Sequence, residues 1–285
     1  VDLNTGALQP PNPDFFITKQ AAVAPELTYR PQLWEKFLVE VTGGDAEYVA
    51  FLKRLAGYLL TGSVKEHVLF VLFGSGGNGK SVFLNTLAGI LGDYAKTVAA
   101  DVFTEARGER HPTELANLAG ARLVIASEIP PGRRWDVERV KALTGGDPIS
   151  ARFMRQDFFT FRPQFKLLIA SNDIPSLGTV DDAIRRRMWL LPFTTKPARP
   201  DLDLEEKLKH EWPAILAWAI EGCLEWQKHG LAMPEAVRAA TEEYLSMQDV
   251  FGAWLEDACE QAPGAFAPAS ALFTSWQHYA EGRGE

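Results

Sequence analysis

The chain has 285 residues, of which 46% are apolar and 23% charged, and its formal net charge is −8, from 29 basic and 37 acidic side chains. This is the composition of an ordinary globular protein, and it excludes a disordered or fibrous chain. The length predicts one large domain with smaller additions, or two domains. The acidic balance argues against a molecule coated in positive charge for nucleic acid, but it leaves room for a local basic site.

The two cysteines, Cys223 and Cys259, belong to no CxxC or Cys/His cluster, so neither a disulfide framework nor a zinc module is expected. Two free thiols fit a reducing cytosol. The longest apolar run, Val68 to Phe73, is far too short to span a membrane. The chain begins with Val and has no basic, apolar leader, so we expect the cut edge of a longer cytoplasmic protein.

The first elements are a proline-rich connector and a helical pair. Five prolines interrupt residues 1–32, and proline sustains neither helix nor strand hydrogen bonding. Between Leu33 and Leu59 apolar residues recur at helical spacing, with a break at Gly43-Gly44. This pattern predicts two packed helices.

From Val68 the pattern changes to short apolar runs. Residues 68–73 form a continuous apolar run bounded by glycine, which is typical of a strand buried on both faces of a parallel sheet. A helix is predicted over 81–91, ending at Gly92. Further strands are predicted at 122–126, 166–170 and 188–191, the last entered by three arginines and stopped by Pro192. Alternating strands and helices predict an α/β fold with a central parallel sheet.

Residues 201–250 return to helical spacing, with Pro213 near the start of the stretch, where a helix tolerates it. A break over 261–268 separates a last stretch, 269–284. The glycine and proline there predict a small appendage that starts near Val250.

The strongest functional signal follows the first strand, where Gly74 to Ser81 match the phosphate-binding pattern G-x-x-x-x-G-K-[ST] in full. Glycines let the backbone wrap a pyrophosphate, Lys80 supplies a cation for the β- and γ-phosphates, and Ser81 offers a hydroxyl to Mg²⁺. The following helix directs its positive end at the phosphates. The predicted nucleotide-binding residues are Gly74, Ser75, Gly76, Gly77, Asn78, Gly79, Lys80, Ser81 and Val82.

Three later features are candidates to complete a nucleoside triphosphatase site. Glu128 ends the strand 122–126 and can hold Mg²⁺ or polarise water, unless it is a surface Glu. Asn172 ends the next strand and can bind the γ-phosphate or the attacking water, unless its Asn-Asp-x-Pro context is only a turn. Arg185, Arg186 and Arg187 can stabilise phosphoryl-transfer charge, unless they form a solvated basic edge.

These motifs occur in a recognisable order: the phosphate loop, a strand ending in Glu, then "VKALTGGDPISARFMRQDFFTFRP", "KLLIASNDIP" and "RRRMWLLPF". The chain resembles the superfamily 3 helicases, specifically the helicase portion of phage and plasmid primase–helicases related to poxvirus-type nucleoside triphosphatases. The resemblance is strong over residues 63–196, and the stretch from Trp34 to Leu60 resembles the helical region that precedes the ATPase core. It implies an AAA+-like ring ATPase, a homo-hexamer that uses ATP and Mg²⁺ and translocates on DNA.

The resemblance also implies residue roles. Lys80 and Ser81 fall on Walker A, Glu128 on the Walker B acid, and Asn172 on sensor 1. Arg187 falls best on the arginine finger, with Arg186 as the second candidate. Ser81 and Glu128 would be the metal ligands. Many family members carry two adjacent acids in Walker B, whereas the first position here is Ser127, which leaves the division of roles open.

A local basic segment is the candidate DNA interface. Residues 133–166 carry eight basic and four acidic side chains within a chain of net charge −8. Phosphate tracking needs such a local supply of cations. Alternation from Ile149 predicts a hairpin, which the resemblance places in the channel of the ring, with Lys141, Arg152 and Arg155 nearest the DNA. Base stacking by Phe153, or by Phe158, Phe159 and Phe161, is weighed against packing of the last three in the sheet.

The sequence pattern and the resemblance together predict an N-terminal linker and helical region (1–62), a core that the resemblance identifies as an AAA+-like ATPase (63–196), and a C-terminal helical region (197–250). Residues 251–285 resemble the start of a winged-helix appendage found in some relatives. The predicted function is an ATP-dependent DNA helicase acting on single-stranded or forked DNA in a bacterial host cell, encoded by a phage or plasmid. Primase activity would need a domain not in this chain. The alternatives are a DNA loader or packaging ATPase that does not unwind, and an ATP-assembled origin-binding initiator.

Overall fold

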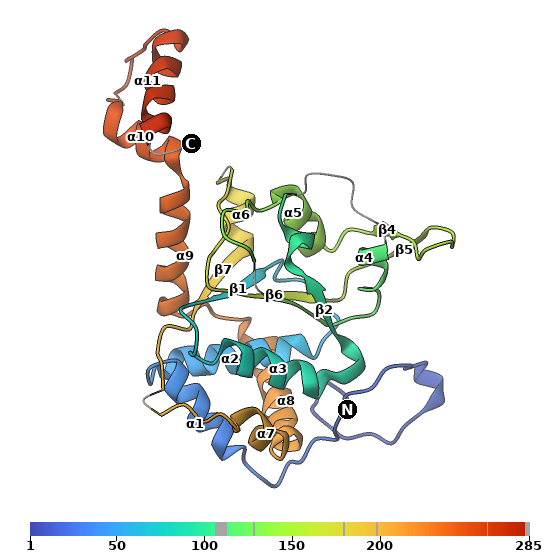
Figure 1. The fold of residues 1–285 in the computed structure, drawn as a ribbon. Helices are drawn as coiled ribbons and strands as arrows, with labels where there is room; N and C mark the ends of the chain where they lie inside the picture. Colours follow the sequence, from blue (N-terminus) through green and yellow to red (C-terminus); the bar gives the residue numbers. More distant parts are fainter. Residues whose placement is uncertain (106–112, 128, 179, 198, 261, 283–285) are drawn as a thin grey trace.

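The computed structural model describes residues 1–105, 113–127, 129–178, 180–197, 199–260 and 262–282. Its centre is a five-stranded sheet in which every neighbouring pair is parallel, in the order β2-β3-β6-β1-β7. The strands are β1 (Leu69–Phe73), β2 (Ala95–Ala99), β3 (Leu123–Ser127), β6 (Lys166–Ser171) and β7 (Met188–Pro192). The α/β fold with a central parallel sheet, flanked by N-terminal and C-terminal helices, is therefore confirmed (Figure 1).

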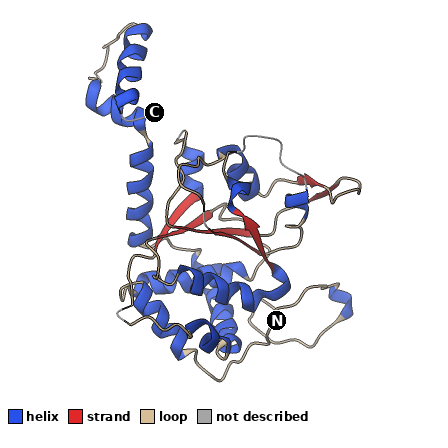
Figure 2. Cartoon of the chain, viewed as in Figure 1, coloured by secondary structure: helices blue, strands red, loops and turns tan. Residues whose placement is uncertain are grey.

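Side chains alternate between two cores, one on each face of the sheet. In β6, Leu168 and Ala170 join one apolar cluster, whereas Leu167 and Ile169 join the other. The first cluster is covered by α1 (Gln32–Val41), α2 (Ala46–Leu59), α3 (Lys80–Leu91), α7 (Leu204–Lys209) and α8 (Trp212–His229). The second is covered by α5 (Val137–Gly145), α6 (Asp182–Arg187) and part of α9 (Glu235–Gln248). The result is a three-layer α/β/α arrangement (Figures 1 and 2).

Two glycines let α2 and α8 approach until their backbones touch. A Cβ atom on Gly57 would lie 2.0 Å from the backbone nitrogen of Cys223, and one on Gly222 would lie 2.0 Å from the carbonyl oxygen of Lys53. No larger residue fits either position. This contact joins the N-terminal and C-terminal helical regions beneath the sheet, although they are more than a hundred residues apart in the chain.

The remaining described elements are short or peripheral. They are the 3-10 turns η1 (Pro13–Phe15), η2 (Gly92–Tyr94) and η3 (Ala100–Phe103), the helix α4 (Thr113–Ala116), the hairpin β4 (Ile149–Ala151) and β5 (Phe159–Phe161), and the helices α10 (Val250–Ala258) and α11 (Ala269–Gly282). The predicted N-terminal helical pair and the hairpin are present, and a helix begins at Val250, where the appendage is predicted to start. No helix in the described part of the chain has the length and apolar character needed to cross a membrane.

One strand was not predicted, and one expectation was wrong. The edge strand β2 was missed because its residues, Ala-Lys-Thr-Val-Ala, are half exposed and form no apolar run. The arginines 185–187 do not enter β7 but form the last turn of α6, whose first turn is capped by the Asp181 carboxylate accepting from the Ile184 N–H at 2.8 Å.

Lys166 also departs from the expected basic surface of residues 133–166. It is only 2% exposed, and its amine donates to the carbonyl oxygen of Thr61 just past the end of α2. Arg122 donates to the neighbouring carbonyl of Leu60 at 2.5 Å. Both cations satisfy carbonyls left free at a helix C-terminus. Lys166 is therefore a structural residue and cannot contact DNA.

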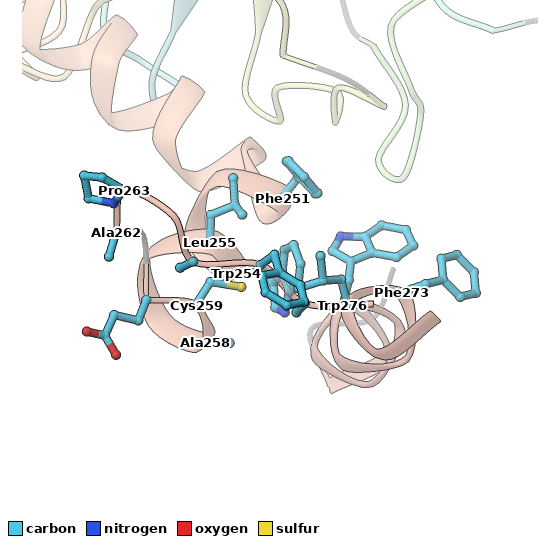
Figure 3. A pocket seen from close by; sticks show the side chains of 14 residues that line it. Phe251, Trp254, Leu255, Ala258, Cys259, Ala262, Pro263, Phe273 and Trp276 are labelled. Carbon is cyan, nitrogen blue, oxygen red and sulfur yellow. The ribbon is translucent and has the colours of Figure 1, made fainter. Parts of the chain in front are cut away.

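The last two helices stand clear of the sheet at the end of α9 (Figure 1). Helix α9 itself lies along β7, where the Thr241 hydroxyl accepts a hydrogen bond from the Leu190 N–H at 2.9 Å. Aromatic side chains of α10 and α11 line a cavity of about 1100 Å³ (Figure 3). The described part of this region contains these two helices, and the start of a winged helix stays a prediction.

Candidate nucleotide site

The phosphate loop is folded so tightly that two of its glycines admit no side chain. Gly74 has φ +145°, and a Cβ atom there would lie 2.0 Å from the carbonyl oxygen of Phe193. Gly79 has φ +87°, and its Cβ would lie 2.7 Å from Phe37 and from Val41 of α1. The loop is thus held between β7 on one side and α1 on the other.

Lys80 is the centre of the site. It is the first residue of α3 and is 7% exposed. Its amine donates to the Gly74 carbonyl at 2.6 Å, to Asn78 Oδ1 at 3.0 Å and to Asn172 Oδ1 at 3.1 Å. Asn172 lies at the end of β6, the strand beside β1. The structure therefore brings the predicted sensor residue to the predicted phosphate lysine across 92 positions of sequence.

Asn78 connects this centre to the far side of the loop. It is 1% exposed, accepts from Lys80 through Oδ1, and donates through Nδ2 to the carbonyl of Phe193 at the exit of β7. The sequence places Asn78 among the ligand-binding residues only because it lies within the motif. In the structure its side chain connects the loop to the end of β7 through hydrogen bonds.

The electrostatics of the site favour an anion. Burial lowers the pKa of Lys80 from its usual value, because desolvation disfavours the charged amine. The described part of the chain places no carboxylate against this amine to offset the effect. A bound phosphate would supply the missing counter-charge and raise this pKa again. The N-terminus of α3 has no side-chain cap, so its free N–H groups also favour a bound anion.

A cavity of about 590 Å³ opens over these groups. Its walls are the loop and first turns of α3, together with Thr97, Ile125 and the segment Ala170 to Asp173. The Ser81 side chain is exposed to it, as an Mg²⁺ ligand needs to be. Magnesium usually keeps several waters and binds through substrate phosphates and one or two protein oxygens, so one hydroxyl beside a phosphate cradle fits it.

A second cavity of about 270 Å³ lies on the other side of the same loop and shares Gly77, Gly79 and Val82 with the first. Phe37 and Val41 of α1 form its apolar wall, and Arg199 lies at its edge. Sequence reasoning missed this part of the site, because nothing in the helical pattern of 33–41 indicates that it faces the loop.

Helix α1 is held in this position by a buried carboxylate. Glu211, 7% exposed at the start of α8, accepts from the N–H groups of Leu33 and Trp34 at 3.1 and 2.9 Å. A carboxylate at a helix N-terminus also interacts favourably with the helix dipole. Glu211 therefore fixes the wall that α1 presents to the loop.

The remaining predicted catalytic residues divide into two groups. Glu128 lies outside the described residues. The strand β3 that precedes it ends at Ser127, in register with Ala170 of β6, on the same sheet edge as Asn172. Arg187 lies elsewhere: it precedes β7, whose first residue pairs with Leu69 at the start of β1. Five strand residues, about 16 Å, separate that edge from the phosphate loop.

None of the three arginines is aimed at the cradle of its own chain. Arg187 donates to the carbonyl of Ala183 and Arg186 to that of Asp182, whereas Arg185 is paired with Asp249 at 2.7 Å. Within the described residues the Arg187 Nε has no hydrogen-bond partner, although it is buried. Arg186 is exposed.

The candidate DNA residues are not equivalent. Lys141 is on α5, where its amine contacts Asp181 at 2.8 Å and Glu138 at 3.1 Å, and these hydrogen bonds raise its pKa. Arg152 and Arg155 are both exposed on the β4–β5 hairpin, which projects from the body (Figure 1). The Arg152 guanidinium lies 4.7 Å above the ring of Phe158.

The aromatic residues of the hairpin form a small stack of their own. The rings of Phe153 and Phe159 are stacked at 5.7 Å, and Phe161 follows at 6.0 Å from Phe159. Phe158 is 59% exposed and Phe153 36% exposed. Phe161 packs against the second apolar core, as the packing alternative predicted, whereas Phe153 and Phe158 remain accessible at the surface.

Comparisons with known proteins relate the chain to viral proteins and to one uncharacterised family. Residues 72–187 match the model of a family described as a family of unknown function, DUF5906. "Putative helicase L207/L206" of Acanthamoeba polyphaga mimivirus is 29% identical over 234 residues, covering 75% of this chain and 24% of that protein. "Putative helicase 022R" of Frog virus 3 is 26% identical over 255 residues, covering 80% of this chain and 26% of that protein.

The solved structures with a similar fold include the C-terminal region (305–718) of NrS-1 in its apo form. It has a TM-score of 0.57 and 15% sequence identity, covering 78% of this chain and 53% of that one. The A form of the same region has a TM-score of 0.58 at 14% identity, covering 83% of this chain and 58% of that one. At this identity the likeness shows the fold alone.

The fold and the relatives together support a helicase-like protein, similar at low identity to proteins of large DNA viruses that carry the name "putative helicase". The chain spans about a quarter of the length of these curated relatives.

Proposed function

We propose that this chain is the motor of an ATP-dependent DNA helicase of the superfamily 3, AAA+-like type, working as a homo-hexameric ring on single-stranded or forked DNA. The observation that carries the proposal is the contact of Lys80 with Asn172 beneath the cradle cavity. It joins a phosphate-binding cation and a polar strand end on neighbouring parallel strands, where open α/β sheets bind their ligands.

The proposed mechanism begins with an exchange of partners at Lys80. Its amine leaves the oxygens of Gly74, Asn78 and Asn172 for the β- and γ-phosphates of ATP. This releases the Asn172 amide to hold the γ-phosphate or the attacking water, and Glu128 orients that water. Ser81, together with the phosphates, would hold Mg²⁺, and the ion would supply neutralisation of the charge on the transferred group.

The arginine finger of this mechanism must come from another copy. Arg187 lies at the sheet edge opposite the loop, so it cannot reach the phosphates of its own chain. Arg187 of a second copy, with Arg186 as the next candidate, is proposed to stabilise the charge that develops as the γ-phosphate leaves. ATP would then bind between subunits, and hydrolysis would move the β4–β5 hairpins along the strand.

Unwinding of forked DNA tests the proposal. We expect strand separation that requires ATP and Mg²⁺ and is lost in Lys80→Ala, with its melting temperature retained to show that the fold survives. DNA-stimulated hydrolysis without strand separation would contradict the helicase and favour a loader or packaging ATPase. ATP-dependent assembly without turnover would favour an origin-binding initiator.

A further inference from the structure

The segment that joins Asn172 to Arg187 links the two halves of the proposed mechanism. Asn172 lies at the cradle of its own chain, at the carboxyl ends of the parallel strands. Arg187 lies at the opposite side of the sheet, where the strands begin. Contacts that hold this segment therefore influence the position of Arg187, the proposed arginine finger. Helix α9 and its junction with α10 make such contacts.

Three side chains of this helix and junction contact the segment in turn. The Tyr244 hydroxyl donates to the carbonyl of Pro175, and the Gln248 side-chain oxygen accepts from the Leu177 N–H at 2.8 Å. Asp249 Oδ2 accepts from the guanidinium of Arg185 at 2.7 Å. These contacts begin three residues after Asn172 and end two residues before Arg187.

Asp249 has a second role at the same place. Its Oδ1 accepts from the Gly252 N–H at 2.9 Å and so caps α10, the first helix of the appendage. One carboxylate therefore joins the finger helix α6 to the start of the appendage. The junction also lines a cavity of about 530 Å³ shared with Leu177, Val180 and Trp276 of α11, so α11 lies close to the same segment.

We propose that Asp249 is a positioning residue for the arginine finger: through Arg185 it orients α6 so that Arg187 reaches the nucleotide of the neighbouring subunit, and it couples that orientation to the α10–α11 appendage. The inference rests on the proposed function. It also removes Arg185 from the finger candidates, because its charge is already paired within its own chain.

The test variant is Asp249→Asn, because Asn caps a helix as well as Asp does. Its amide keeps an oxygen for the Gly252 N–H and removes only the charge that holds Arg185. We expect an unchanged KM for ATP and a roughly tenfold lower kcat, since small misplacements of a catalytic group have large effects on rate. Glu206→Gln, which removes an exposed ion pair with Lys209, is the matched control and keeps wild-type kcat and melting temperature.

Mixed subunits separate this effect from a structural one. A mixture of Lys80→Ala with Arg187→Ala should hydrolyse ATP, because a site with an intact cradle then receives an intact finger. Asp249→Asn mixed with Lys80→Ala should recover turnover in the same way, whereas Asp249→Asn mixed with Arg187→Ala should not. Arg185→Gln should reproduce the defect, and the double variant should be no worse than either single one.

The outcomes are distinguishable. If the Lys80→Ala and Arg187→Ala mixture shows no turnover, the trans finger of the proposed function fails and the inference fails with it. If that mixture is active but Asp249→Asn has wild-type kcat, only the inference is overturned. The same conclusion follows if Lys80→Ala subunits do not rescue Asp249→Asn, or if Arg185→Gln is fully active.

Discussion

The buried amine of Lys166 contacts carbonyl oxygens and the ring of Tyr58. No carboxylate of the described residues forms an ion pair with it. Burial lowers its pKa well below the usual value of about 10.5, and the positive charge of Arg122 acts in the same direction. Between the folded and unfolded pKa values the unfolded chain binds more protons. Raising the pH through this window therefore stabilises the fold.

Lys166→Met should remove this pH dependence. We expect the free energy of unfolding of the wild type to rise with pH, relative to the variant, by up to about 1.4 kcal/mol per pH unit within the window. Urea unfolding from pH 7 upward measures it. Lys228→Met, at an exposed position on α8, is the control and should follow the wild-type slope. Parallel curves for wild type and Lys166→Met would contradict the assignment.

At the scale of elements, the hairpin β4–β5 and the helix α5 share the basic segment but present their charges differently. Lys141 of α5 is engaged by Asp181, which also caps α6, so its charge helps to hold two helices together. Arg152 and Arg155 are exposed on the hairpin, and Phe153 and Phe158 lie beside them. The hairpin is therefore the part of the segment best placed to meet a phosphate backbone.

The double variant Arg152→Ala/Arg155→Ala should weaken binding of single-stranded DNA and flatten its salt dependence by about 0.7 in the log–log slope for each phosphate that the protein no longer neutralises. A titration of labelled oligonucleotide at several salt concentrations measures this. Lys209→Ala/Lys228→Ala removes the same charge from exposed positions on α7 and α8 and should leave the slope unchanged. Equal slopes in all three proteins would exclude the hairpin as the interface.

At the scale of the whole molecule, a single chain has only part of the proposed site. The cradle opens at one edge of the sheet, and Arg187 lies at the other. When one surface of a subunit contacts a different surface of the next, the same contact can repeat along a series of subunits. The series closes into a ring when the rotation between neighbouring subunits divides a full turn evenly.

Particle mass therefore should depend on the nucleotide. With ATP, Mg²⁺ and single-stranded DNA we expect about six times the 31.5 kDa of one chain, and a smaller particle without them. Light scattering coupled to size-exclusion chromatography measures both states. A mass of one chain under every condition would contradict a ring.

Local patterns in the sequence were sufficient for the conformation of the glycine-rich loop, the four apolar strands and most helices. Each depends on neighbouring residues: glycines that permit positive φ, apolar runs buried on both faces, and helical spacing. The edge strand β2 was not predicted, because an edge position does not require an apolar run. Arg185 to Arg187 were assigned to the strand, because the short helix α6 is followed directly by β7.

By itself the sequence identified the residues predicted to bind a triphosphate, because the motif is a contiguous stretch of backbone and one lysine. Only the tertiary structure decided which distant residues meet it. It brought Asn172 to Lys80, packed α1 against Gly79, buried Lys166 and separated Arg187 from its own cradle. The physical reason is that strand order and helix packing are set by contacts far apart in the chain, which local spacing does not encode.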